Sequence, residues 1–251
     1  MVCRPFRNQV CLCSSSFRRY VGRIEVSQPP PNFMKMTESI LEENEAFCKS
    51  NDIAHETWVE IVELMNDAID NVLWETKEID WKTLFPRYAM LNYFFSVLMP
   101  LSYGIYFNFL GGNLPVCFTQ LRTLLEQLVK CSMSDRTYPD LSFFQERIKS
   151  LEEAMKRERL SLTKLIETAA PDGASIWRNL SRDWVHFKSF ERIVTIVSER
   201  QEVPGWSLTI PIGYSDTEVP EIGELGNYVS QFRQILVKTA EEWKAKVFIN
   251  S

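Results

Sequence analysis

The feature that most constrains this chain is a run of 34 residues, 88–121, without one formally charged side chain. A helix of about 20 apolar residues crosses a bilayer, so the run is long enough to span a membrane. However, polar residues and Pro100 interrupt it, and Arg87 and Arg122 flank it on both sides, which gives no orientation bias. We therefore expect a buried central helix or a kinked helix pair. Membrane association through 88–110 is the less favoured alternative.

Composition is that of an ordinary soluble globular protein, because 45% of the 251 residues are hydrophobic and 24% are charged. A chain of this length can bury a sizeable core. The 28 basic and 33 acidic side chains leave a net charge of -5. With this balance the chain as a whole does not attract the negatively charged nucleic acids, so binding of RNA would need a local basic patch.

The N-terminal segment 1–33 departs from that average, since it holds five Arg, one acidic residue and three consecutive prolines. A targeting peptide, a basic nucleic-acid arm and a translated upstream region are three interpretations of such a segment. The prolines and the lack of apolar periodicity favour a disordered basic leader that is dispensable for folding. We expect a single helical domain over 34–251.

Cysteine and histidine usage argues against a metal centre. The chain has six Cys and two His, with no CxxC pair and no His cluster. Neither a structural zinc site nor a cofactor is therefore expected. Buried free thiols are typical of a reducing compartment, which predicts a cytoplasmic protein.

The remaining chain is helical in pattern, with apolar residues recurring at spacings of three and four. Only the segment near 205–213 alternates with period two, which predicts a short extended or edge-strand flap. The fold class expected is all-α, a bundle of about six or seven helices. Outside the charge-free run and the helix after it, the helices are expected at 37–50, 53–76, 141–169, 175–200 and 221–248.

The usual enzyme motifs are absent, including the P-loop, GxGxxG, HExxH and GxSxG patterns. Candidate functional residues must therefore come from polar side chains within helices, and whether the protein is an enzyme stays open. One such pair is Arg122 and Glu126, one turn apart in an apolar helix that follows Gly111-Gly112. As a boundary ion pair they would add only a few tenths of a kcal/mol.

The second candidate is the segment IWRNLSRDWVHF, 176–187. Its Trp and Leu residues recur at helical spacing and form one apolar stripe, with Ser181 beside it. Asn179, Arg182 and His186 share the opposite face of an ideal helix. A solvent-facing polar side explains them most simply, whereas a functional role requires a substrate or a second subunit on that face.

The two segments carry the patterns LRxxLE, residues 121–126, and LSxxxxH, residues 180–186. These patterns resemble uncharacterised prokaryotic all-helical proteins of the HEPN-like type. The resemblance implies an internal polar tie in which Arg122 and Glu126 bond Ser181 of the neighbouring helix. We expect the loss of either charge to destabilise the bundle by several kcal/mol, because the other would remain partly buried and unpaired.

The same resemblance implies a metal-independent ribonuclease that acts at a dimer interface. In that hypothesis His186 transfers the proton, Arg182 or Arg178 stabilises the phosphate, and Asn179 orients either group. The function expected first is nonetheless a soluble regulatory or interaction protein that binds a protein partner or forms a homodimer. The ribonuclease, with RNA as its partner and a role in defence, is the alternative, and a membrane-associated protein is the second alternative.

Overall fold

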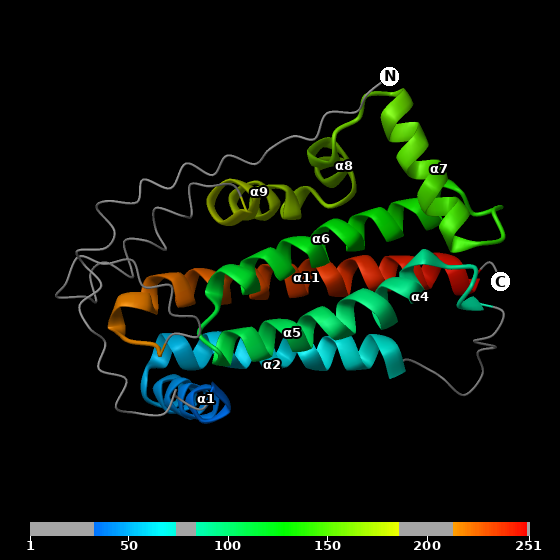
Figure 1. Cartoon of the computed structure of the whole chain (residues 1–251). Helices are drawn as coiled ribbons and strands as arrows, with labels where there is room; N and C mark the ends of the chain where they lie inside the picture. Colours follow the sequence, from blue (N-terminus) through cyan, green and yellow to red (C-terminus); the bar gives the residue numbers. More distant parts are fainter. Residues whose placement is uncertain (1–32, 74–83, 186–212, 250–251) are drawn as a thin grey trace, which may run out of the picture. The chain divides into compact units, whose positions relative to one another are not determined.

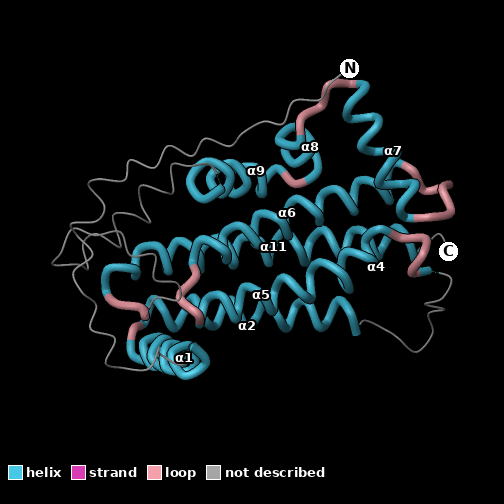
Figure 2. Tube along the Cα trace, in the orientation of Figure 1, coloured by secondary structure: helices cyan, strands magenta, loops and turns pink. Residues whose placement is uncertain are grey.

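The computed structural model describes residues 33–73, 84–185 and 213–249, and every regular element in these ranges is a helix (Figure 2). The all-α class is thus confirmed. Contacts divide the chain into two compact units, Met1–Met36 and Thr37–Ser251. Most of the predicted leader and all but the last residue of the predicted flap lie outside the described residues.

Four long helical stretches form the core of the second unit (Figure 1). One of them is continuous through three elements, because α4 and the π-helix η2 lead directly into α5. Helix α2 packs on α11, α11 on α6, α6 on α5, and α5 on α2, which closes a ring around a shared apolar interior. The elements are α2 (Asp52–Leu73), α4 (Ala89–Tyr93), η2 (Phe94–Leu98), α5 (Met99–Leu110), α6 (Leu114–Thr137) and α11 (Val219–Ile249).

Helices α2 and α11 run in the same direction. Thr57 Oγ1 donates to the carbonyl of Ile222 at 3.0 Å, and further along both helices Arg233 Nε donates to Asp67 Oδ2 at 2.7 Å. Helices α5 and α6 are instead antiparallel, joined by a turn in which Gly112 has a φ of 71°. Glycine adopts this left-handed conformation without the steric cost of a side chain.

The connection from α6 to α11 carries further helices that pack on α6. They are α7 (Phe144–Arg157), α8 (Leu162–Ala169), α9 (Pro171–Asn179) and the π-helix η3 (Leu180–Val185), and the short η4 (Asp216–Glu218) precedes α11. Residues 37–50 of helix α1 (Phe33–Ser50) belong to the same unit, and there Asn44 Nδ2 donates to the Leu110 carbonyl at 2.8 Å. Asn44 Oδ1 also accepts from the Tyr214 amide at 2.6 Å. Over the described residues, the separate helices slightly outnumber the six or seven that the sequence pattern predicted.

The difference arises at the expected helix 141–169, which is wrong as a single element. Helix α7 ends where Arg159 takes a left-handed φ of 53°, and the Leu160 amide bonds the Met155 carbonyl at 2.8 Å. Ser161 then caps α8 by accepting from a backbone amide. This helix end usually uses glycine, and an arginine there leaves no sequence sign of the break.

The charge-free run forms the rod Ala89–Leu110 and the start of α6. The π-helical stretch ends just before Pro100, which cannot donate the backbone hydrogen bond of a regular α-helix. Within the described residues, this rod is the one helix whose length and apolar character would allow it to cross a membrane. In its most apolar 18-residue stretch, 39% is buried inside the protein. Its inward side packs on α2 and α6, as in a core helix, while its outward side carries the exposed side chains of Phe95 and Phe107.

The thiols Cys48, Cys117 and Cys131 are free and buried, as expected for this part of the chain. Burial raises the pKa of Cys48 and of Cys131 to about 12. These thiols therefore stay protonated at neutral pH and belong to the packed core.

Candidate functional site

The Arg122 side chain lies where α6 meets α9 and η3. Its Nε donates to Ser181 Oγ at 2.9 Å, and its guanidinium carbon lies 5.2 Å from the centre of the Trp177 ring. Its Nη2 is 3.8 Å from Glu126 Oε2, while Lys130 Nζ lies 3.0 Å from the other oxygen of that carboxylate. The contact between Arg122 and Ser181 that the sequence suggested is present.

This cluster is less buried than an internal tie would be. The Arg122 and Glu126 side chains are 22% and 19% exposed, so water reaches both. The apolar neighbours on α6, including Leu121 and Leu125, are fully buried and place the pair at the edge of the core. The cluster orients η3 against α6, and its charges are screened more than those of a dry interior pair.

The polar side of α9 and η3 holds the residues expected for a ribonuclease. Arg178 pairs with Glu167 of α8, and this pairing lowers the pKa of Glu167. Arg182 bonds the carboxylate of Asp183 at 2.6 and 2.7 Å and approaches Asn179 Oδ1 at 3.4 Å. The structure thus brings Arg182 and Asn179 together but pairs Arg178 with a different helix.

The expected acid-base residue, His186, lies outside the described residues. The preceding residues adopt the wider π-helical geometry of η3. The ideal-helix positions used for the sequence prediction therefore do not carry over past Leu180.

A second polar cluster, which the sequence did not reveal, lies inside the bundle around Asp135. Its Oδ1 accepts from Arg147 Nη1 and from the Ala89 amide, both at 3.0 Å. Its Oδ2 accepts from the Met90 amide and from Trp243 Nε1, also at 3.0 Å. One carboxylate thereby joins α4, α6, α7 and α11.

The Arg147 guanidinium is equally well satisfied. Its Nε donates to the Leu141 carbonyl at 2.9 Å, and Nη2 donates to the Pro139 carbonyl at 2.7 Å. Its carbon lies 4.9 Å from the centre of the Tyr88 ring. Burial raises the pKa of Asp135, while the donated hydrogen bonds and the Arg147 charge oppose that rise. The pair is thus a structural centre whose charges compensate each other.

One sequence feature could have pointed to this cluster. The rod begins at Ala89, and the preceding residues Phe85 to Tyr88 include none of the Ser, Thr, Asp or Asn residues that cap helices. A helix start without a local cap, if buried, needs an acceptor from elsewhere in the chain. Asp135 supplies it and places a negative charge at the positive end of the helix dipole.

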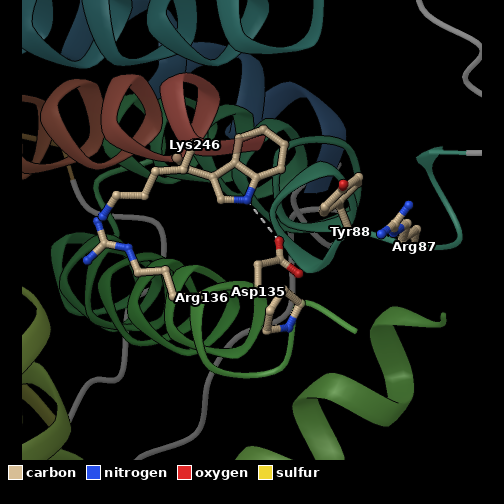
Figure 3. A pocket seen from close by; sticks show the side chains of 7 residues that line it. Arg87, Tyr88, Asp135, Arg136 and Lys246 are labelled. Atoms are coloured by element: carbon tan, nitrogen blue, oxygen red, sulfur yellow. Dashed lines mark hydrogen bonds between the residues drawn. The ribbon is translucent and has the colours of Figure 1, made fainter. Parts of the chain in front are cut away.

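A cavity of about 380 Å³ opens beside this cluster. Figure 3 shows Arg136 on one side of Asp135, Arg87 and Tyr88 on the other, and Lys246 on the wall that α11 provides. The side chain of Arg136 also pairs with Glu242 at 2.5 Å. Among the described residues, those that line the cavity are Arg87, Tyr88, Asp135, Arg136, Pro139, Trp243 and Lys246.

The outward side of the rod carries a row of uncharged large side chains. Phe95, Met99, Tyr103 and Phe107 follow one another at four-residue intervals, which places neighbours in the row one turn apart. Phe95 is 37% and Phe107 is 61% exposed, and the two residues between them are partly exposed. We call these four residues the aromatic row.

Comparisons with protein-family models, curated proteins and solved structures give no match to this chain. Over the ranges that the structure describes, no group of three His, Cys, Asp or Glu side chains is placed to hold a metal ion. The arrangement of the described residues is therefore what bears on function.

Proposed function

We propose that this protein is an interaction module that binds a second copy of itself through the aromatic row. The observation that carries the proposal is the exposure of Phe95 and Phe107 on a rod without charged residues. The cores of protein interfaces are depleted of charge and enriched in aromatic residues and Met, which is the composition of this row. A regulatory or scaffolding role follows from such association.

A second copy suits the row for an electrostatic reason. A two-fold interface brings the same patch of both subunits together, so residues near the axis face their own copies and a charge there would face an equal charge. The aromatic row avoids this repulsion, although the whole chain carries a net charge of -5. Its four residues span about 18 Å at 1.5 Å per residue, enough to form the centre of an interface between two antiparallel rods.

A bilayer is the competing partner for an apolar row. Spanning it would require the rod to leave α2 and α6, on which its inward side packs. Fully buried side chains such as Phe94, Leu98 and Phe109 would exchange a packed protein interior for lipid. Association with a second protein chain keeps these contacts and covers only the open side.

The test is the mass of the full chain in detergent-free solution, measured by light scattering across a dilution series. The wild type is expected to be a dimer at high concentration, and Phe107→Glu is expected to be a monomer, because a buried unpaired carboxylate opposes association. Val237→Glu is the control, since Val237 is an exposed apolar residue on α11, outside the aromatic row. A monomeric wild type, or a dimer that survives Phe107→Glu, would contradict the proposal.

The ribonuclease hypothesis stays a prediction without a favouring geometric observation. Arg178 and Arg182 are each paired with a carboxylate of their own chain, so binding a phosphate would require exchange of an ion pair. RNA cleavage by the purified protein that is lost in His186→Ala, with the fold unchanged, would support it.

A further inference from the structure

We propose that Met99 is an oxidation site that controls the self-association of this protein. A peroxide converts the Met99 thioether to the sulfoxide, and the oxidised chain no longer forms the dimer. Met99 is the second residue of the aromatic row and lies partly exposed between Phe95 and Tyr103. The inference rests on the proposed self-association, since it concerns the regulation of that same surface.

The two methionines of the rod Ala89–Leu110 differ in their access to a dissolved oxidant. Met90, near the start of α4, is fully buried, and its backbone amide donates to Asp135. Met99, at the start of α5, is partly exposed in the aromatic row. Oxidation of a methionine requires access to its sulfur, so a peroxide should modify Met99 and spare Met90.

Met99 also lies close to the centre of the proposed interface. The row extends from Phe95 to Phe107, so its midpoint is at position 101, and Met99 and Tyr103 lie two residues to either side. When two rods pair antiparallel about this midpoint, Met99 of each copy faces Tyr103 of the other. A methionine sulfur gains from contact with an aromatic ring, so the dimer holds two such contacts at its centre.

The chemical step is a two-electron oxidation in which a peroxide is the second reactant. The Met99 sulfur attacks one oxygen of hydrogen peroxide, a sulfur–oxygen bond forms, and the oxygen–oxygen bond breaks. The departing oxygen takes up the proton of the transferred oxygen and leaves as water. The sulfur is thereby oxidised and the peroxide reduced, and the product is the polar methionine sulfoxide.

The sulfoxide opposes association because it replaces an apolar group by a polar one. Water satisfies its oxygen in the free chain, whereas the interface would surround it with the side chains of the row. Burial of a polar group without a hydrogen bond costs free energy, and a two-fold interface incurs this cost in both copies. The equilibrium therefore shifts to the free chain, in which the sulfur is also accessible to the oxidant.

The experiment compares the wild-type chain with Met99→Leu before and after treatment with dilute hydrogen peroxide. Peptide mass spectrometry locates the added oxygen, and light scattering over a dilution series gives the dissociation constant of the dimer. For the wild type we expect this constant to rise about tenfold or more, and methionine sulfoxide reductase should restore it. Met99→Leu should dimerise equally well before and after treatment, because leucine has a similar volume and no sulfur.

Both chains carry an internal control for the oxidation itself. Met34 lies outside the aromatic row and is 70% exposed, so the peroxide should modify it in the wild type and in Met99→Leu alike. Oxidation of Met34 in a Met99→Leu chain that stays dimeric shows that the effect belongs to Met99. Circular dichroism spectra that are the same before and after treatment show that the helices persist.

Three results would overturn the inference while the untreated chain is still a dimer and the proposed function stands. They are a dimer that persists with Met99 oxidised, oxidation of Met34 that leaves Met99 unmodified, and equal dissociation of treated Met99→Leu. Loss of the helical signal on treatment would also overturn it, because dissociation would then follow unfolding. An untreated wild type that is monomeric would contradict the proposed function and this inference together.

Discussion

Helix α6 carries two polar clusters that look alike in composition but differ in burial. Near its middle, Arg122 and Glu126 lie one turn apart at 3.8 Å, with side chains 22% and 19% exposed. Near its end, Asp135 bonds Arg147 at 3.0 Å, with side chains 1% and 0% exposed. The first pair lies within one helix, whereas the second joins two helices and also holds the start of α4.

Proximity in sequence therefore does not show which polar contacts matter most for stability. A partly exposed pair gains little because water solvates both charges when the pair is absent. A buried pair is different, because the loss of one partner leaves the other charge without water or a counter-charge. The end of α6 should therefore be much more sensitive to mutation than its middle.

The largest effect is expected for Arg147→Met or Asp135→Ala, each about 3 to 5 kcal/mol of unfolding free energy. Either change leaves one buried charge without its partner, and Asp135→Ala also removes the acceptor for two backbone amides and Trp243. Urea denaturation followed by circular dichroism measures the loss.

The double variant Asp135→Leu, Arg147→Met sharpens this test. It removes both charges together, so it should lose clearly less than the sum of the single losses. Strictly additive losses would mean that the two side chains are not coupled. Losses below about 1 kcal/mol in both single variants would place this pair in the same class as a surface pair.

A smaller effect is expected for Arg122→Ala, about 1 to 2 kcal/mol, since it removes the bond to Ser181 and the stacking on Trp177. The exposure of Arg122 lowers this value from the several kcal/mol expected for a buried tie. A cycle with Ser181→Ala should give a coupling of about 0.5 to 1.5 kcal/mol. Arg157→Ala, at an exposed position on α7, is the control that should change little.

The smallest effect expected is a difference between the two clusters in how strongly salt changes the stability lost on mutation. In 1 M salt the screening length falls to about 3 Å, so the loss caused by Glu126→Gln should shrink by a few tenths of a kcal/mol. The loss caused by Asp135→Asn should stay the same, because ions do not reach that carboxylate. Equal salt dependence at both sites would contradict the difference in burial described above.

Much of the fold follows from local pattern. Apolar spacing predicts α2 and α11 nearly to their ends, and the Gly111-Gly112 turn with Pro115 predicts where α6 begins. The break between α7 and α8 could not be predicted in this way, because Arg159 occupies a position that glycine usually takes. Its left-handed conformation is held by the surrounding hydrogen bonds and not by its own preference.

The candidate sites, too, are only partly predictable from the sequence. Arg122 and Glu126 can be found from sequence because a helix brings residues four apart onto one side, and the Ser181 partner followed from a resemblance between motifs. The sequence shows that the segment with the aromatic row lacks charged residues. Which side of the rod is exposed, however, depends on the packing of α2 and α6. Periodicity places residues on one helix and says little about which helices meet.

Local sequence therefore determines which segments of this chain are helical and which faces of them are apolar, because both depend on neighbours within one or two turns. Only the tertiary structure decides that Asp135 caps α4, that Arg147 bonds the same carboxylate, and that Trp243 of α11 donates to it. These contacts join residues far apart in the chain. Their energies come from the exclusion of water, which occurs only after the helices have packed.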